Sequence, residues 1–204
     1  MKMKASKGGE GDYTPCPEGS WPAILVGLFD VGTHREPGYQ GAPDEDVRKC
    51  VLVWEVHTDE APAPWIVLRD YRLSFHEKAG LRKLIEGWRG KAFGEDEEFD
   101  LDTLKGRAAL VQITHKVAKT SGNTYGRLES VMKLPKQIQP PTAKHAAVVW
   151  SVDDGKPFPA LEYDCYLRGE PLADVVKRAA ELRGGNGHAA TAAAATAAEA
   201  EEVF

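Results

Sequence analysis

Residues 105–136 read KGRAALVQITHKVAKTSGNTYGRLESVMKLPK, and this stretch decides the fold that the sequence predicts. Residues 108–116 and 124–134 are rich in Val, Ile, Thr, Leu and Tyr, most of which favour strands. Between them, residues 119–123 (KTSGN) contain Gly and Asn, which accept the positive φ angles of tight turns. The stretch therefore predicts a β-hairpin.

The predicted hairpin carries charge mostly of one sign. It holds seven Lys and Arg residues and one acid, Glu129, although the whole chain has a formal net charge of −5. Alternation places Tyr125 and Arg127 on one face of the returning strand, with Glu129 and Lys133. A basic hairpin with an aromatic residue suits a polyanion, whereas lysines on strands also protect sheet edges. The basic residues therefore suit either a polyanion-binding surface or an ordinary protected sheet edge.

The composition of the whole chain limits the class of protein. A length of 204 residues suits one domain with tails. Three cysteines, Cys16, Cys50 and Cys165, lie far apart and form no C-x-x-C pair, which favours a reducing compartment such as the cytoplasm. No apolar run approaches about 18 residues, so we expect no membrane span. The first residues lack the apolar core of a signal peptide.

Three short apolar segments precede the hairpin and are predicted to be strands: residues 23–31, 48–57 and 65–73. In the second segment, Lys49 and Glu55 share one face and Trp54 lies on the other. A helix is expected next, over residues 77–89. Ser74 and Glu77 match a capping box, the helix has one apolar stripe, and Gly90 is placed to end it.

The predicted elements divide the chain into four parts. Residues 1–20 form a flexible arm, and residues 21–136 form the main domain. Residues 137–183 form an extension that contains a helix near residues 171–183 and one more candidate strand near residues 145–152. The sequence is compatible with an extension that completes the barrel, packs outside it or helps the chain to oligomerise. Residues 184–204 form a disordered Gly/Ala-rich linker and acidic tip.

Strand order and helix position together predict the fold class. We expect a mainly β protein with one or two helices, built as an OB-like five-stranded barrel with a helix between strands three and four. Such barrels bind single-stranded nucleic acids on aromatic and basic surfaces. The sequence thus points to a nucleic-acid-binding domain followed by a tail.

The C-terminal tip supports this interpretation. It ends in Glu199, Glu201, Glu202, Val203 and Phe204, and so resembles the tip of bacterial and phage single-stranded-DNA-binding proteins. The resemblance implies that these five residues dock on replication or recombination proteins, with the Phe in an apolar pocket and the carboxylates held by Arg or Lys. A solvated acidic terminus or a frayed helix is the alternative.

A second resemblance lies within the domain. Residues 71–82 (YRLSFHEKAGLR) and 88–93 (WRGKAF) are similar to runs found in a group of phage OB-fold proteins of the single-strand-binding type, and the similarity covers roughly residues 21–135. It implies binding of single-stranded DNA without strong sequence preference, during phage replication or recombination in the host cytoplasm. A homodimer is a further hypothesis.

The residues expected to contact DNA are aromatic or basic. Trp54, Tyr71 and Tyr125 are the stacking candidates, although Trp54 shares its face with apolar residues, a position that favours the core over a stacking platform. The phosphate-binding candidates are Lys49, Arg69, Arg72, Lys116, Lys119, Arg127 and Lys133.

Other functional classes receive less support from the sequence. We expect no enzyme and no cofactor, because catalytic, metal-binding and phosphate-loop motifs are absent. The acids in residues 95–102 could be imagined as the metal ligands of a nuclease, but they lie in one contiguous run typical of a solvated loop. An annealing mediator or a protein-binding adaptor is the stronger alternative.

Overall fold

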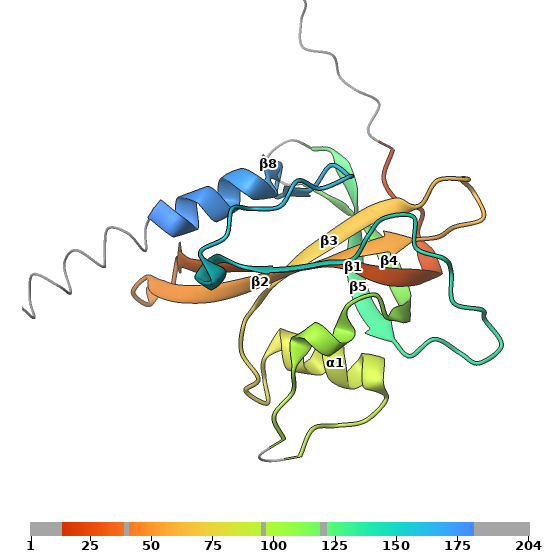
Figure 1. The fold of residues 1–204 in the computed structure, drawn as a ribbon, viewed down its shortest axis with the longest axis horizontal. Coiled ribbons are helices and arrows are strands. Elements are labelled where there is room, and N and C mark those ends of the chain that lie inside the picture. Colours follow the sequence, from red (N-terminus) through yellow and green to blue (C-terminus); the bar gives the residue numbers. More distant parts are fainter. Residues whose placement is uncertain (1–13, 39–40, 95–96, 119–121, 182–204) are drawn as a thin grey trace, which may run out of the picture.

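The computed structural model describes residues 14–38, 41–94, 97–118 and 122–181. Figure 1 shows a sheet that lies between two helices. The main strands are β1 (Gly19–Glu36), β2 (Glu45–Val56), β3 (Trp65–Arg72), β4 (Ala108–Val117), β5 (Thr124–Met132) and β6 (Val148–Ser151). The helices are α1 (Gly80–Arg89) and a C-terminal helix described over residues 172–181. The short elements are η2 (Leu101–Leu104), η3 (Val152–Asp154), β7 (Tyr166–Leu167) and β8 (Glu170–Pro171).

The sheet is antiparallel along the order β3-β2-β1-β4-β5, and β6 adds a parallel partner beside β1. The predicted hairpin is confirmed as β4 and β5, which pair from Leu110 with Met132 to Val117 with Thr124. The candidate strand in the extension is confirmed as β6. Five antiparallel strands thus follow the predicted order, with α1 between β3 and β4.

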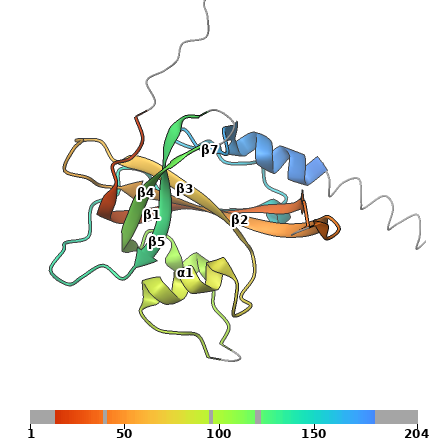
Figure 2. The same cartoon turned by 180° about the vertical axis from the view of Figure 1, so that it is seen from behind.

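Each face of the sheet has its own hydrophobic core. Leu52 and Trp54 of β2 point into one core, which α1 closes, whereas Val51 and Val53 point into the other, which the C-terminal helix closes. Figures 1 and 2 show these two helices on opposite sides of the sheet. Because side chains alternate along a strand, the apolar run of β2 supplies both cores at once.

The extension is therefore an integral layer of this fold. Trp150, Leu172, Val175 and Val176 are buried against the second face of the sheet. Burial of apolar area at about 25 cal/mol per Å² is the main stabilising term here. The predicted boundary near residue 137 separates no independent unit, since the domain would lose the cover of one face without the extension.

Helix α1 has the predicted apolar stripe but a different start. Leu81, Ile85 and Trp88 are buried in the first core, and Gly90 adopts a left-handed φ of 67° and ends the helix as predicted. The capping-box prediction is wrong, because the helix begins at Gly80 and its N-cap makes no side-chain hydrogen bond. Ser74 Oγ instead accepts a hydrogen bond from the His76 backbone within the preceding loop.

The first described residues are attached to the sheet and do not form the predicted loose arm. Cys16 is 3% exposed, and its carbonyl lies 2.9 Å from His115 Nε2. Glu18 Oε1 accepts a hydrogen bond from the His115 backbone at 2.5 Å, and the Trp21 indole donates to Pro17. Residues 14–18 therefore pack along β4 before β1 begins. Residues 1–13 lie outside the described residues.

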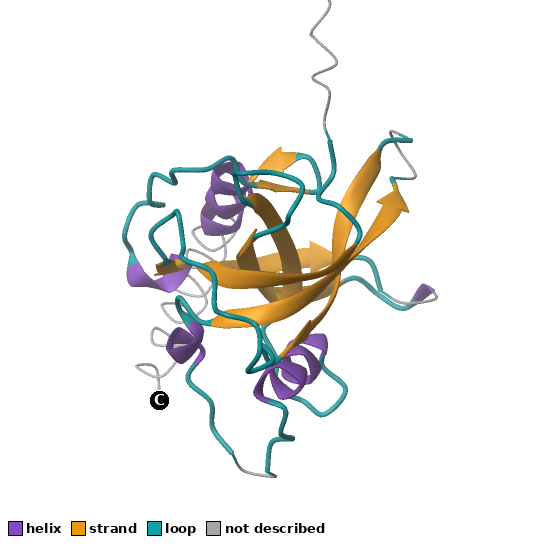
Figure 3. Cartoon of the chain, turned by 90° about the vertical axis from the view of Figure 1, so that its right-hand side faces the viewer, coloured by secondary structure: helices purple, strands orange, loops and turns teal. Residues whose placement is uncertain are grey.

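The sheet is open along the seam between its edge strands β3 and β5. Among the described residues these two strands are in contact but are not paired by backbone hydrogen bonds. The seam is bridged by Arg69, whose guanidinium donates to the Leu128 carbonyl at 2.6 Å. Figure 3 shows the sheet curving so that its strands cross one another. No helix in the described part of the chain is long and apolar enough to cross a membrane.

Gly27 marks a point of the sheet where neighbouring side chains leave no room for a further one. It follows a register shift in β1, and a Cβ added there would lie 2.4 Å from Phe29 Cε2 and 2.9 Å from Val53 Cβ. We expect Gly27→Ala to lower the free energy of unfolding by about 1–3 kcal/mol through overpacking, measured by urea denaturation. Gly94→Ala is the matched control, because its Cβ would meet nothing closer than 3.8 Å. Equal midpoints for the two variants would contradict the expectation.

Candidate nucleic-acid interface

Three of the predicted DNA-binding residues are buried and cannot form a contact surface. Trp54 is fully buried and packs on Trp88, with ring centroids 4.8 Å apart. Lys49 is 7% exposed and Tyr71 is 9% exposed. The predictions of Trp54 as a stacking platform and Lys49 as a phosphate ligand are therefore wrong, because the two cores cover both faces of β2.

Lys49 forms ion pairs with acids inside the fold. Its ammonium lies 3.0 Å from Asp70 Oδ2 and also pairs with Glu36. Burial tends to raise the pKa of Asp70, but the Lys49 hydrogen bond and the charge of Arg168 hold that pKa below its ordinary value. Since a buried charge needs a partner, this lysine is neutralised within the fold and does not face a ligand.

Arg72 is exposed but is engaged by acids of neighbouring strands. Its guanidinium pairs with Glu45 and lies 3.6 Å from Glu36. Exposed pairs of this kind stabilise little, so a phosphate could displace them. Arg72 is therefore a weaker candidate than the cations on the hairpin.

Arg69 and Tyr71 lie together at the seam between β3 and β5, and Arg127 of β5 is near enough for its charge to act on the Tyr71 hydroxyl. The Arg69 guanidinium lies 5.4 Å from the centre of the Tyr71 ring. Burial raises the pKa of the Tyr71 hydroxyl, and the nearby charges of Arg69 and Arg127 oppose that rise. Tyr71 is thus a covered ring on which the Arg69 guanidinium packs, and not an exposed stacking surface.

The outer face of the β4–β5 hairpin carries the exposed part of the candidate site. Lys116 pairs with Tyr125 and Thr114 with Arg127 in the ladder, so these four side chains lie on one face. Tyr125 is 39% exposed, and Lys116 is exposed beside it. An aromatic ring thus stands directly opposite a lysine, one pair away from an arginine.

A bulge in the hairpin changes which residues continue this face. The register shifts between Gln112 and Ile113, and Glu129 falls in the shift without a partner in the ladder. Simple alternation predicts Glu129 and Lys133 on the Tyr125 face; the Glu129 carboxylate does lie beside Arg127, but past the bulge the ladder continues this face with Ser130 and Met132, not with Lys133. The sequence gives no local sign of this bulge.

The remaining predicted residues are placed as follows. Lys133 is exposed just after β5. Arg127 lies 3.5 Å from Glu129, and both side chains are well exposed, so this pair holds the guanidinium only weakly. Lys119 and the tip residues Glu199, Glu201, Glu202, Val203 and Phe204 lie outside the described residues.

The acidic connector has structural partners where it is described. Glu97 accepts a hydrogen bond from the Gly94 backbone and pairs with Arg89 at 2.5 Å. Asp100 accepts a hydrogen bond from the Asp102 backbone at the start of η2. Within the described ranges no group of three or more His, Cys, Asp or Glu side chains could hold a metal ion. The connector thus ties α1 to β4.

Comparison with known proteins adds no relative to this description. No family model matches the chain, and no curated protein matches it. The fold and the hairpin surface therefore define the class of this protein: a mainly β domain that displays a basic, aromatic hairpin.

Proposed function

We propose that this protein binds single-stranded DNA without strong sequence preference, with the β4–β5 hairpin as its contact surface. The observation that carries the proposal is the exposed Tyr125 ring, flanked by Lys116 across the ladder and by Arg127 along the strand. Base stacking on an aromatic ring and phosphate contacts to Lys and Arg are the two terms that bind single strands in general. Every base has a π-face, so such a surface tolerates any sequence.

The dimensions of the hairpin suit a short binding site. Outward pairs in an antiparallel ladder recur about every 7 Å, so the row from Lys116 to Leu110 extends roughly 20 Å. OB folds contact roughly 4–16 nucleotides, and this row corresponds to the short end of that range. The seam behind it adds the guanidinium of Arg69.

An OB-like barrel is the architecture that we propose for the five antiparallel strands. The order β3-β2-β1-β4-β5 and the helix between β3 and β4 are those of an OB fold, and Arg69 bridges the seam that would close the barrel. OB folds commonly bind on the face of strands two and three. Here that face is covered by the second core, which favours the hairpin as the open surface.

The biological role that we propose rests on this activity together with the resemblances of residues 71–82, 88–93 and 199–204. The protein protects and extends single strands during phage DNA replication or recombination in the host cytoplasm, without catalysis. The tip residues 199–204 recruit a partner protein through the terminal Phe and its acidic neighbours.

Substitution of Tyr125 tests the proposal directly. We expect Tyr125→Ala to weaken binding of a labelled oligo-dT by about 5- to 150-fold, because a stacked base contributes about 1–3 kcal/mol. The measurement is fluorescence anisotropy at several salt concentrations. Arg127→Ala should weaken binding as well and lower the log–log salt slope by about 0.7.

Controls separate the hairpin from general charge effects. Lys83→Ala removes an exposed cation of α1 that is not part of the outer face of the hairpin, and should leave affinity unchanged. Duplex DNA of the same length should bind more weakly than oligo-dT. Absence of oligo-dT binding at low salt, by the full chain and by a chain shortened before residue 199, would refute the proposal.

A further inference from the structure

The two-residue turn between β7 and β8 has an unusual residue at its tip. Arg168 and Gly169 both have positive φ angles, 56° and 86°, as a tight hairpin with two central residues requires. Asn-Gly and Asp-Gly are the usual choices for such turns. Arg168 is the only residue other than glycine with a positive φ within the described ranges, and an L side chain in this region is strained.

The contacts of Arg168 within the fold do not account for its presence. Its guanidinium donates to Asp70 Oδ2 at 2.9 Å, but Asp70 is already held by the buried Lys49 at 3.0 Å. The Arg168 side chain is 69% exposed, and exposed ion pairs contribute little to stability. A strained backbone that presents an exposed guanidinium suggests selection for a contact beyond the fold.

The turn lies next to the proposed hairpin surface. Arg69 and Asp70 are consecutive residues of β3; Arg69 bonds to β5 and Asp70 bonds to Arg168 of the turn. Side chains of consecutive strand residues point to opposite faces, so the two hairpins are attached to neighbouring residues of β3, one on each face.

The β7–β8 hairpin also carries an exposed aromatic residue. Tyr166 is 54% exposed, whereas its neighbour Leu167 packs against the second core. The hairpin thus repeats the combination seen on β4 and β5, an exposed tyrosine with a nearby cation. It belongs to the layer that covers the face where OB folds commonly bind.

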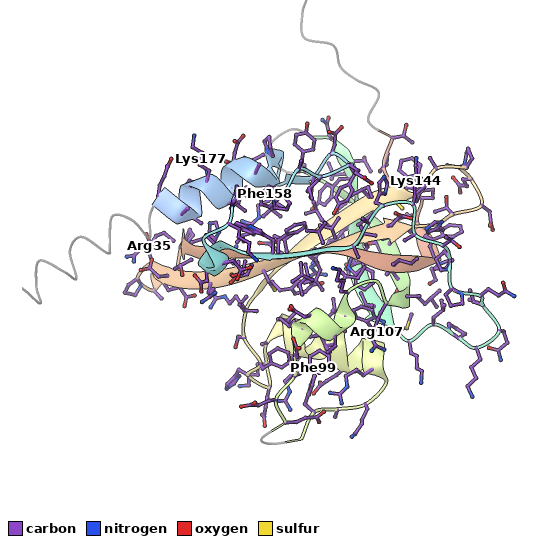
Figure 4. All side chains as sticks on the ribbon, viewed as in Figure 1. Arg35, Phe99, Arg107, Lys144, Phe158 and Lys177 are labelled. Atoms are coloured by element: carbon purple, nitrogen blue, oxygen red, sulfur yellow. The ribbon has the colours of Figure 1, made fainter. Side chains whose placement is uncertain are left out.

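The turn stands at the edge of a cleft of about 360 Å³ lined by charges of both signs, a volume in the range of small-ligand sites. Its walls come from β1, β2, β3, the turn and the C-terminal helix. The cations that line it are Arg35, Arg168, Arg178 and the buried Lys49, and the acids are Glu36, Asp70 and Glu170, which pair with the last three of these cations. Figure 4 shows Arg35 at the end of the β1–β2 hairpin, below the C-terminal helix that carries Lys177.

We propose that the β7–β8 turn is a second contact element for single-stranded DNA, in which Arg168 binds a phosphate and Tyr166 stacks on a base. The strand runs from the β4–β5 hairpin across β3 to the turn and the mouth of the cleft. The layer of residues 144–181, which covers one face of β2 and β3, thereby supplies the DNA contacts that this covered face cannot make. This inference rests on the proposed function and lengthens its binding site.

The deciding experiment uses Arg168→Asn in the full chain. Asn accepts positive φ and forms the preferred Asn-Gly turn, so the thermal midpoint should stay the same or rise. Affinity for oligo-dT should fall about fivefold or more, and the salt slope should fall by about 0.7. A purely structural role would not combine weaker binding with equal or higher stability.

Two further variants make the result unambiguous. Arg168→Lys keeps the charge and should retain most of the affinity, and Tyr166→Ala should weaken binding of a long oligo-dT more than that of a short one. Wild-type binding that Tyr125→Ala weakens, but that Arg168→Asn and Tyr166→Ala leave unchanged, would overturn this inference alone. Absence of wild-type binding would overturn both proposals together.

Discussion

Trp54→Ala is expected to lower the free energy of unfolding by about 3–5 kcal/mol, the range for removing a large aromatic side chain from a packed core. Trp54 is fully buried, and its ring contacts Trp88 of α1 in the first core. Its loss would open a cavity where β2 meets the helix. Urea denaturation followed by circular dichroism measures the effect, and a loss below about 1 kcal/mol would contradict the placement of Trp54 in the core.

Trp54→Phe is the matched control for this experiment. The Trp54 indole N–H finds no hydrogen-bond partner among the described residues, so a smaller aromatic ring sacrifices packing but no polar contact. We expect the loss for Phe to be clearly smaller than that for Ala. Oligo-dT titration of Trp54→Phe should match the wild type, since a buried ring stacks on no base.

Glu55→Ala is expected to destabilise the protein by about 3–5 kcal/mol, because it leaves buried donors without an acceptor. Glu55 is fully buried on β2, facing the second core. Its carboxylate accepts hydrogen bonds from the backbone of Lys144 at 2.7 Å and of His145 at 3.0 Å. The rings of His145 and His57 lie 2.8 and 2.9 Å from the same carboxylate. This group fastens the extension to the sheet.

The same carboxylate predicts a pH dependence. Burial tends to raise the pKa of Glu55, but hydrogen bonds from Lys144, His145 and His57 hold it below its ordinary value. A depressed pKa contributes stability that is complete above the unfolded pKa of about 4.3. That stability is lost as the pH falls through the folded pKa.

Comparison with Glu55→Gln measures this contribution. The amide preserves volume but cannot accept all four hydrogen bonds, and it does not titrate. We expect the stability difference between wild type and Glu55→Gln to be largest near neutral pH and to shrink below pH ~4. A difference that stays constant from neutral to acidic pH would show that the Glu55 charge has no such role.

Local patterns predicted the elements and part of the candidate site. The β4–β5 hairpin, the apolar stripe of α1 and the Gly90 stop each depend on residues a few positions apart. Tyr125, Arg127 and Lys116 were placed on the hairpin surface for the same reason. The position of Arg168 at a strained turn has a weak signal, the Gly that follows it, but Arg-Gly is not a recognised turn pair.

The buried residues of the candidate site could not be recognised in this way. Alternation assigned Lys49 and Trp54 to opposite faces of β2, and both assignments agree with the structure. Alternation could not predict whether each residue is exposed, because exposure depends on which segment covers each face. The bulge between Gln112 and Ile113 likewise moved Glu129 out of the ladder without any change in composition.

The sequence by itself determined the order and type of the elements, because strand and helix periodicities are properties of neighbouring residues. Only the tertiary structure decided which faces remain open. Residues 144–181 return to the sheet from a long distance along the chain, and Glu55 and the second core hold them there. Whether a strand face is buried depends on the segment that packs on it. For β2 that segment lies nearly a hundred residues further along the chain.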